Sequence, residues 1–212
     1  MKSSAVKART TAINQLTGLV VGAEPGLRGL TTKALTRACA VMLPTSVERM
    51  LMAELAHRIS SLTDELTRLK TVITQTVTAC VPELLQRSGI GYDSAAALII
   101  AVGDNPERMT NEASFAALCG VSPVEFSSGQ TTKRRLNRGG NRQANAALYR
   151  IVLTRLRWDP RTQEYLKNRT EKGTSKRDVI RCLKRYIARE IFTIIKTIPD
   201  QPKHLTLVDL TP

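Results

Sequence analysis

Residues 46–80 read SVERMLMAELAHRISSLTDELTRLKTVITQTVTAC, and this stretch decides the fold class. Its apolar residues recur at alternating spacings of three and four, the heptad pattern of helices that pair along one apolar stripe. These positions are Met52, Leu55, Ile59, Leu62, Leu66, Leu69 and Ile73. With Ser46 as N-cap and Pro82 beyond the end, one helix of about 30 residues is predicted. The pattern favours a coiled coil that makes a homo-oligomer over a helix docked on its own domain, and pairing within the chain stays open.

Apolar periodicity after this helix predicts further helices, and strand patterns are almost absent. The expected helices cover residues 95–102, 107–119, 142–157 and 175–197. Gly103 and Gly120 would end two of them, and Asn141 or Gly140 would begin the third. The last helix has an apolar stripe of Val179, Leu183, Ile187, Ile191 and Ile194. Near the N-terminus, residues 5–16 predict a helix that ends in a loop. The fold class is therefore all-α, a long coiled-coil helix followed by a compact helical domain.

Composition excludes several classes of protein. The chain has 212 residues, of which 42% are hydrophobic and 4% aromatic. Its longest apolar run, residues 95–102, is far shorter than the 20 or so residues of a membrane span. The few aromatic residues argue against a base-stacking RNA-recognition sheet. No pair of the four cysteines has a metal or redox spacing, so four buried thiols in the cytoplasm and no cofactor are expected.

Positive charge is concentrated in one segment. The chain carries 32 Lys and Arg against 18 Asp and Glu, a net charge of +14. Residues 127–200 carry 19 basic and 6 acidic side chains, a net charge of +13. Such a block indicates a polyanion as partner, because neutralising phosphates releases counterions. The candidate DNA-binding cations are Lys133, Arg134, Arg135, Arg138, Arg142, Arg177, Arg181, Lys184, Arg185 and Arg189.

A Gly-Ile-Gly turn at residues 89–91 lies between two predicted helices. It is similar to half of a helix-hairpin-helix module, in which backbone N–H groups point at a DNA phosphate and glycine permits close approach. Gly89 and Gly91 are therefore candidate DNA-binding residues. A plain tight turn between packed helices is an equally good interpretation.

Five short motifs together point to one family. They are SGIG at 88–91, FAALCGVSP at 115–123, SSG at 127–129, GN at 140–141 and RCLKRYIARE at 181–190. With them, residues 84–192 resemble the C-terminal transposase domain of the insertion-sequence-110 family, which is related to the Piv-type DNA invertases. A coiled coil at residues 46–80 fits the resemblance, since family members carry one just before this domain.

The resemblance implies a DNA recombinase that excises and inserts a mobile element. Family members combine a RuvC-like domain, whose four acidic residues bind Mg²⁺, with a serine that precedes a glycine in the C-terminal domain. The matching position is Ser128, which would attack a DNA phosphate and form a phosphoserine link. Ser127 is the rival, because only the family pattern prefers Ser128. Family members also use a structured guide RNA to choose their sites, so a guide RNA is a possible partner beside DNA.

The chain departs from the family pattern in its length. Residues 1–45 are expected to be the end of a RuvC-like domain, 46–80 the coiled coil, 81–197 the transposase domain and 198–212 a loop-like tail. Four metal-binding carboxylates do not fit into residues 1–45, so a truncated copy without its own Mg²⁺ site is expected. Ala144-Asn145 also replaces a common Leu-Arg pair. The alternatives are a non-catalytic dimeric DNA-binding fragment that acts as a regulator, and an RNA-binding scaffold.

Overall fold

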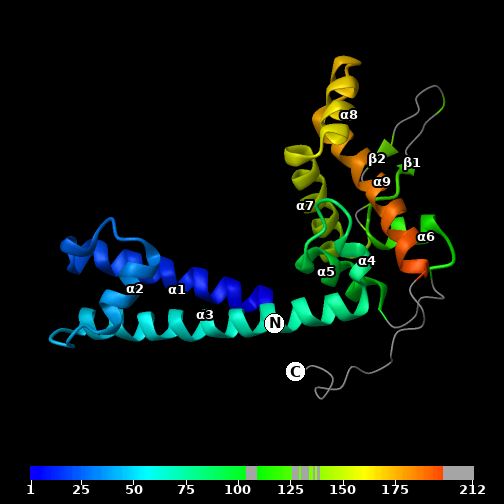
Figure 1. Ribbon diagram of the computed structural model, residues 1–212. Helices are drawn as coiled ribbons and strands as arrows, with labels where there is room; N and C mark the ends of the chain where they lie inside the picture. Colours follow the sequence, from blue (N-terminus) through cyan, green and yellow to red (C-terminus); the bar gives the residue numbers. More distant parts are fainter. Residues whose placement is uncertain (104–108, 126–128, 130–133, 136, 138, 198–212) are drawn as a thin grey trace. The chain divides into compact units, whose positions relative to one another are not determined.

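The computed structural model describes residues 1–103, 109–125, 129, 134–135, 137 and 139–197. This part of the chain is predominantly helical, which confirms the all-α fold class (Figure 1). The chain divides into two compact units, Met1–Val72 and Ile73–Pro212. The predicted long helix is confirmed as α3 (Val47–Cys80), which contributes residues to both units. Ser46 caps it as predicted, because the backbone N–H of Arg49 donates to the Ser46 hydroxyl at 3.3 Å.

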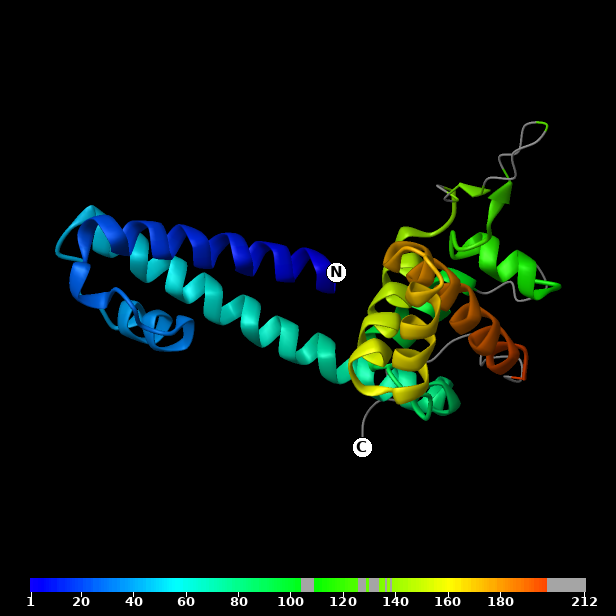
Figure 2. The same cartoon turned by 90° about the horizontal axis from the view of Figure 1, so that it is seen from above.

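The first unit contains α1 (Lys2–Ala23), a 3₁₀ turn (Pro25–Leu27), α2 (Thr32–Ala40) and the first part of α3. Within it, α1 and α3 lie side by side in opposite directions (Figure 2). Their shared core consists of Ala12, Leu16, Val20, Leu35, Cys39, Met52, Ala56 and Ile59. The start of the heptad stripe is therefore covered from within the chain. Pairing between chains along the rest of α3 stays a prediction.

The prediction that the first helix ends near Leu16 is wrong. The helix continues to Ala23, and Val20 is 2% exposed within the core of the first unit. Glycines at 18 and 22 do not interrupt it, because tertiary packing outweighs their weak helix propensity. No helix in the described part of the chain is long and apolar enough to cross a membrane.

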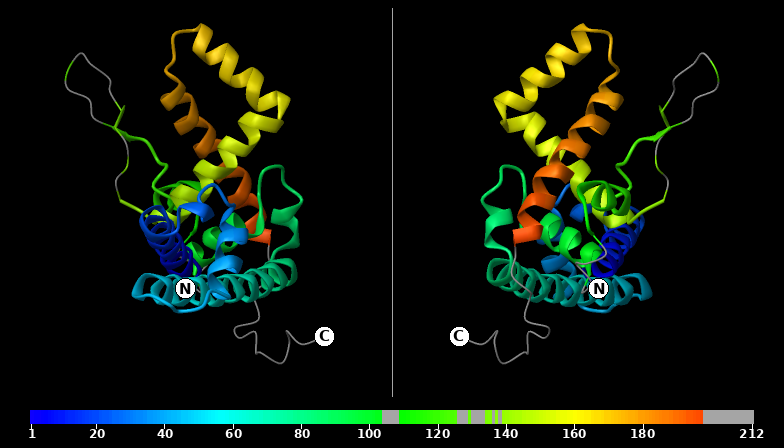
Figure 3. Two further views of the ribbon diagram at one scale, coloured as in Figure 1. Left: turned by 90° about the vertical axis from the view of Figure 1, so that its left-hand side faces the viewer. Right: turned by 90° about the vertical axis from the view of Figure 1, so that its right-hand side faces the viewer.

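The second unit follows α3 with one short sheet and six further helices among its described residues. In chain order these are α4 (Pro82–Leu85), α5 (Tyr92–Val102), α6 (Glu112–Leu118), β1 (Val124–Glu125), β2 (Arg134–Arg135), α7 (Arg142–Trp158), α8 (Pro160–Glu171) and α9 (Lys176–Thr197). Both α5 and α9 pack on α7, and α6 packs on α9. After α7 the chain turns into α8, which leads back to α9 (Figure 3).

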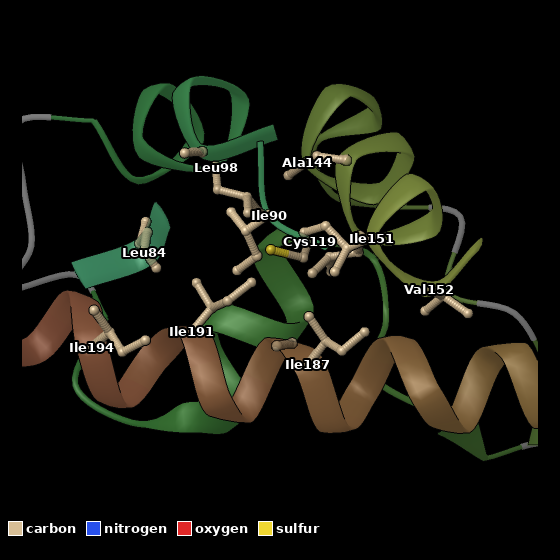
Figure 4. Close-up of a cluster of buried hydrophobic side chains, with 14 of the residues drawn as sticks. Leu84, Ile90, Leu98, Cys119, Ala144, Ile151, Val152, Ile187, Ile191 and Ile194 are labelled. Atoms are coloured by element: carbon tan, nitrogen blue, oxygen red, sulfur yellow. The ribbon is translucent and has the colours of Figure 1, made fainter. Parts of the chain in front are cut away.

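The predicted stripe of α9 forms the centre of the core of the second unit. All five of its residues are buried, and Ile187, Ile191 and Ile194 point toward Leu84, Ile90, Cys119 and Ile151 (Figure 4). The predicted apolar face of α7 lies on the opposite side of this core and is fully buried. That face consists of Ala144, Ala147, Leu148, Ile151 and Val152.

Three elements differ from the sequence prediction. Helix α6 begins at Glu112 instead of residue 107, because the Asn111 side chain caps it by accepting the N–H of Ser114 at 2.9 Å. Helix α8 was not predicted; Asp159 caps it and Pro160 occupies its first position. The third is the antiparallel pairing of β1 with β2, in which Val124 lies opposite Arg135 and Glu125 opposite Arg134.

Candidate functional site

The segment between α6 and α7 contains the candidate nucleophile. Ser127, its neighbour Ser128, and the cations Lys133 and Arg138 lie outside the described residues. Arg134 and Arg135 make up β2, and the structure describes their backbone but not their side chains. What the structure does describe is the base of this segment, where the chain leaves α6 and returns to α7.

Two glycines bring the ends of this segment into direct backbone contact. Gly140 has a φ of +94°, and a Cβ there would lie 2.7 Å from the carbonyl oxygens of Ala117 and Leu118 and from the nitrogen of Gly120. Gly120 has a φ of +63°, and its Cβ would lie 2.8 Å from the Gly139 oxygen. Only glycine fits such positions, since a side chain at one end of the segment would collide with the backbone of the other end. The segment therefore leaves and re-enters the domain at one fixed point.

A buried polar link ties this fixed point to α9. The amide of Asn145 donates to the carbonyl oxygens of Cys119 at 2.9 Å and Gly120 at 3.0 Å. Its oxygen accepts from the ammonium of Lys184 at 3.0 Å. Lys184 is only 7% exposed, so this candidate DNA-binding cation does not lie on the exposed surface of α9. Burial, and then the charge of Arg181, lower the pKa of Lys184. Asn145, which departs from the family pattern, thus satisfies three polar groups.

The remaining cations of α9 differ in how they are paired. Arg181 forms an ion pair with Asp178 at 2.6 Å and remains about half exposed. Arg185 and Arg189 both pair with Glu112 of α6. Arg177 of α9 and Arg142 in the first turn of α7 are exposed. The candidate cations of α9 are therefore partly neutralised by carboxylates, which come from α6 and from α9 itself.

A cavity of about 340 Å³ lies in this part of the second unit. Its lining comes from α9, from the residues that lead into β1, and from Asn137, which follows β2. Arg181, Lys184 and Arg185 all line it. The structure thus brings three of the predicted DNA-binding cations together around one hollow.

The Gly-Ile-Gly turn packs against α7. Gly89 has a φ of +77°, and a Cβ there would lie 3.2 Å from both the Ile151 oxygen and the Cγ of Arg155. Arg155 in turn donates to the Ser88 oxygen at 2.8 Å and forms a two-pronged ion pair with Glu190 of α9. Gly91, the N-cap of α5, has open space around it. Gly89 therefore serves packing, while the Gly91 side of the turn is accessible.

This difference predicts unequal effects of alanine at the two glycines. We expect Gly89→Ala to lower the free energy of unfolding by about 2–4 kcal/mol, because it adds both a strained φ and a clash with backbone. Gly91→Ala should cost about 0.5 kcal/mol, since its φ of −99° suits any residue. Urea unfolding of both variants measures this, and equal losses would contradict the placement of Gly89.

The cysteines fit the prediction only in part. Cys39 and Cys119 are buried free thiols, and burial raises the pKa of Cys119 to about 12. Cys80 and Cys182 are half-buried, so the prediction of four buried thiols is wrong for these two; Cys182 lines the cavity. Among the described residues, no three His, Cys, Asp or Glu side chains are grouped so that they could hold a metal ion.

Comparison with known proteins finds a family match within the second unit. Residues 81–167 match the family model described as Transposase IS116/IS110/IS902 family. This segment is a transposase domain of that family. The matched residues of the transposase domain include the Gly-Ile-Gly turn, the closed base at Gly120 and Gly140, and the position of Ser128.

One curated relative supports the same assignment. The insertion element IS110 uncharacterized 43.6 kDa protein of Streptomyces coelicolor (strain ATCC BAA-471 / A3(2) / M145) is 28% identical over 116 residues. The alignment covers 54% of this chain and 28% of that protein. The chain thus matches little more than a quarter of the relative's length.

Sequence reasoning missed the polar contacts that hold the transposase domain together. Arg155 and Glu190 are 35 positions apart, and Asn145 and Lys184 are 39 apart. No periodicity links such pairs. The only signal in the sequence was that Lys184 follows Leu183 of the apolar stripe, which places it at the edge of the buried face.

Proposed function

We propose that this chain acts in DNA transposition by binding DNA and by covalent strand cleavage at Ser128. The family match to an IS110-type transposase carries the proposal, because it spans the segment that contains Ser128. Two further observations support it. The segment starts and ends at the glycine contact between Gly120 and Gly140, and three cations line a cavity beside its base.

The proposed chemistry exchanges one phosphodiester for another. The Ser128 Oγ bonds to phosphorus while the bond from phosphorus to a sugar oxygen breaks; serine loses its proton and the leaving oxygen gains one. The energy of the broken bond is kept in the phosphoserine link, so rejoining needs no external energy source. Nearby Arg and Lys side chains would stabilise the charge that develops on the phosphate. The Mg²⁺ that the resemblance implies belongs to the acidic domain of the family, and no step assigned to this chain uses it.

DNA binding should depend steeply on salt. Each phosphate contact contributes a slope of about −0.9 to log K against log salt on duplex DNA. Arg142 and Arg177 are exposed and lie on different helices. We therefore expect each of the variants Arg142→Ala and Arg177→Ala to lower the affinity for DNA by the same factor whatever the DNA sequence. Fluorescence anisotropy of a labelled duplex across a salt series measures both effects. Binding that does not change with salt would contradict the proposal.

A further inference from the structure

The cavity beside α9 has the dimensions and the lining of a ligand site. Its volume of about 340 Å³ lies within the range of small-molecule pockets, about 300–1,000 Å³. Its rim is fixed, because Asn137 donates to the Ser122 hydroxyl at 3.0 Å and so joins the residues that lead into β1 to those that follow β2.

The charges around the cavity favour an anion. Lys184 is buried, and its contact among the described residues is the neutral oxygen of Asn145, with no carboxylate in ion-pair distance. A buried ammonium without a counter-charge is costly and is stabilised by an anion that enters beside it. Arg181 and Arg185 also line the cavity, and each is paired with a carboxylate, Arg181 with Asp178 and Arg185 with Glu112 of α6. With these ion pairs in place, the ammonium of Lys184 is the positive charge of the described lining that has no carboxylate partner.

One aromatic ring gives the cavity a second kind of contact. Tyr186 lines it from the turn of α9 that follows Cys182, and its side chain is 52% exposed. The ring of Tyr165 holds it edge-to-face, with centroids 5.9 Å apart and planes at 89°. The orientation of Tyr186 is thus set before any ligand binds. An oriented, half-exposed tyrosine beside cations is what an unpaired base stacks on, whereas a paired base offers no free face.

We infer that this cavity holds one unpaired nucleotide of the DNA strand that the transposase domain acts on. Lys184 and Arg181 contact its phosphate, and Tyr186 stacks on its base. The inference rests on the proposed function, which makes DNA the expected ligand. Ser128, the proposed nucleophile, belongs to the segment whose base borders the cavity. A base extruded from a duplex costs unpairing energy, so single-stranded DNA should enter more readily.

Cys182 supplies a reporter within the cavity itself. In a Cys80→Ser background it is the half-buried thiol that remains, beside the buried Cys39 and Cys119. The test uses mass spectrometry to measure how fast a small maleimide modifies Cys182. The rate is compared without DNA, with a single-stranded oligodeoxynucleotide of mixed sequence and about 12 nucleotides, and with the corresponding duplex. We expect saturating single-stranded DNA to slow the modification about tenfold or more, and the duplex to slow it much less.

Three variants assign the protection to the cavity. Arg181→Ala and Lys184→Met should each raise the concentration of single-stranded DNA needed for protection about tenfold or more, the loss typical of a charged hydrogen bond. Lys176→Ala is the matched control, since Lys176 is exposed on the same helix and does not line the cavity. Circular dichroism checks the fold of the Lys184→Met variant, and the exposed Arg181→Ala variant carries the test should Lys184→Met unfold.

The outcomes separate this inference from the proposed function. DNA that binds by anisotropy but leaves Cys182 reactive overturns the nucleotide site and leaves the proposed function standing. Failure of any DNA to bind overturns both. Stronger protection by an oligoribonucleotide of the same sequence overturns the DNA assignment and makes the cavity an RNA site. Equal effects of Lys176→Ala and Arg181→Ala would show general attraction instead of a site, which overturns the inference.

Discussion

Gly140→Ala should lower the free energy of unfolding of the second unit by at least about 3 kcal/mol. A Cβ at this position would lie 2.7 Å from three backbone atoms, so relief requires the end of α6 to move away from the start of α7. That movement would break the bond from the Asn141 N–H to the Leu118 oxygen, which is 2.6 Å long. The strained φ of +94° adds its own cost. Thermal and urea unfolding measure the loss.

Gly173→Ala is the matched control for this prediction. Gly173 lies between α8 and α9 with a φ of +81°, and a Cβ there would meet nothing within 4 Å. It therefore reports the cost of the backbone conformation alone, about 1–2 kcal/mol. If Gly140→Ala costs no more than Gly173→Ala, the close backbone contact at the base of the segment is wrong.

Ser128→Ala should abolish covalent attachment of the chain to DNA while leaving its DNA affinity unchanged. Removing the attacking hydroxyl removes the step itself, and loss of a nucleophile typically costs a factor of about 10³ or more in rate. Attachment is measured by denaturing gel with a nicked suicide substrate, from which the cleaved strand cannot be rejoined. The reaction is run with the chain alone and with the acidic domain of an intact family member added.

Ser127→Ala is the control for that prediction, since the two serines are neighbours of the same size. We expect it to retain attachment. If Ser127→Ala loses attachment and Ser128→Ala keeps it, the assignment is reversed. The wild-type chain could bind DNA and yet form no covalent attachment, either alone or with the acidic domain added. In that case the chain is a DNA-binding module without this chemistry, which supports the regulator alternative.

Much of the helical structure could be predicted from local signals. The cap at Ser46, the cap at Asn141 and the helix end at Gly103 are each set by one residue and its neighbours. The apolar stripe of α9 predicted five buried positions, and all five are buried. Helix α8 could have been predicted as well, because Asp159-Pro160 is a common helix start, but its polar composition gives no apolar stripe.

Other features depend on partners that a sequence does not reveal. The heptad pattern shows that α3 needs an apolar partner, and α1 and α2 together supply it for Met52 and Ile59. Basic residues at helical spacing predict a cationic face only when no acid lies opposite, and Glu112 lies opposite Arg185 and Arg189. The two-residue pairing of β1 with β2 is too short to leave a pattern.

The most direct test of the account is to identify the residue that carries DNA after the suicide substrate has reacted. Nuclease digestion of the trapped adduct leaves a short nucleotide on the protein, and tandem mass spectrometry locates it. We expect the nucleotide on Ser128, which lies between β1 and β2 in the sequence. A nucleotide on any other residue, or no adduct from protein that is fully bound to its substrate with the acidic domain present, would contradict it.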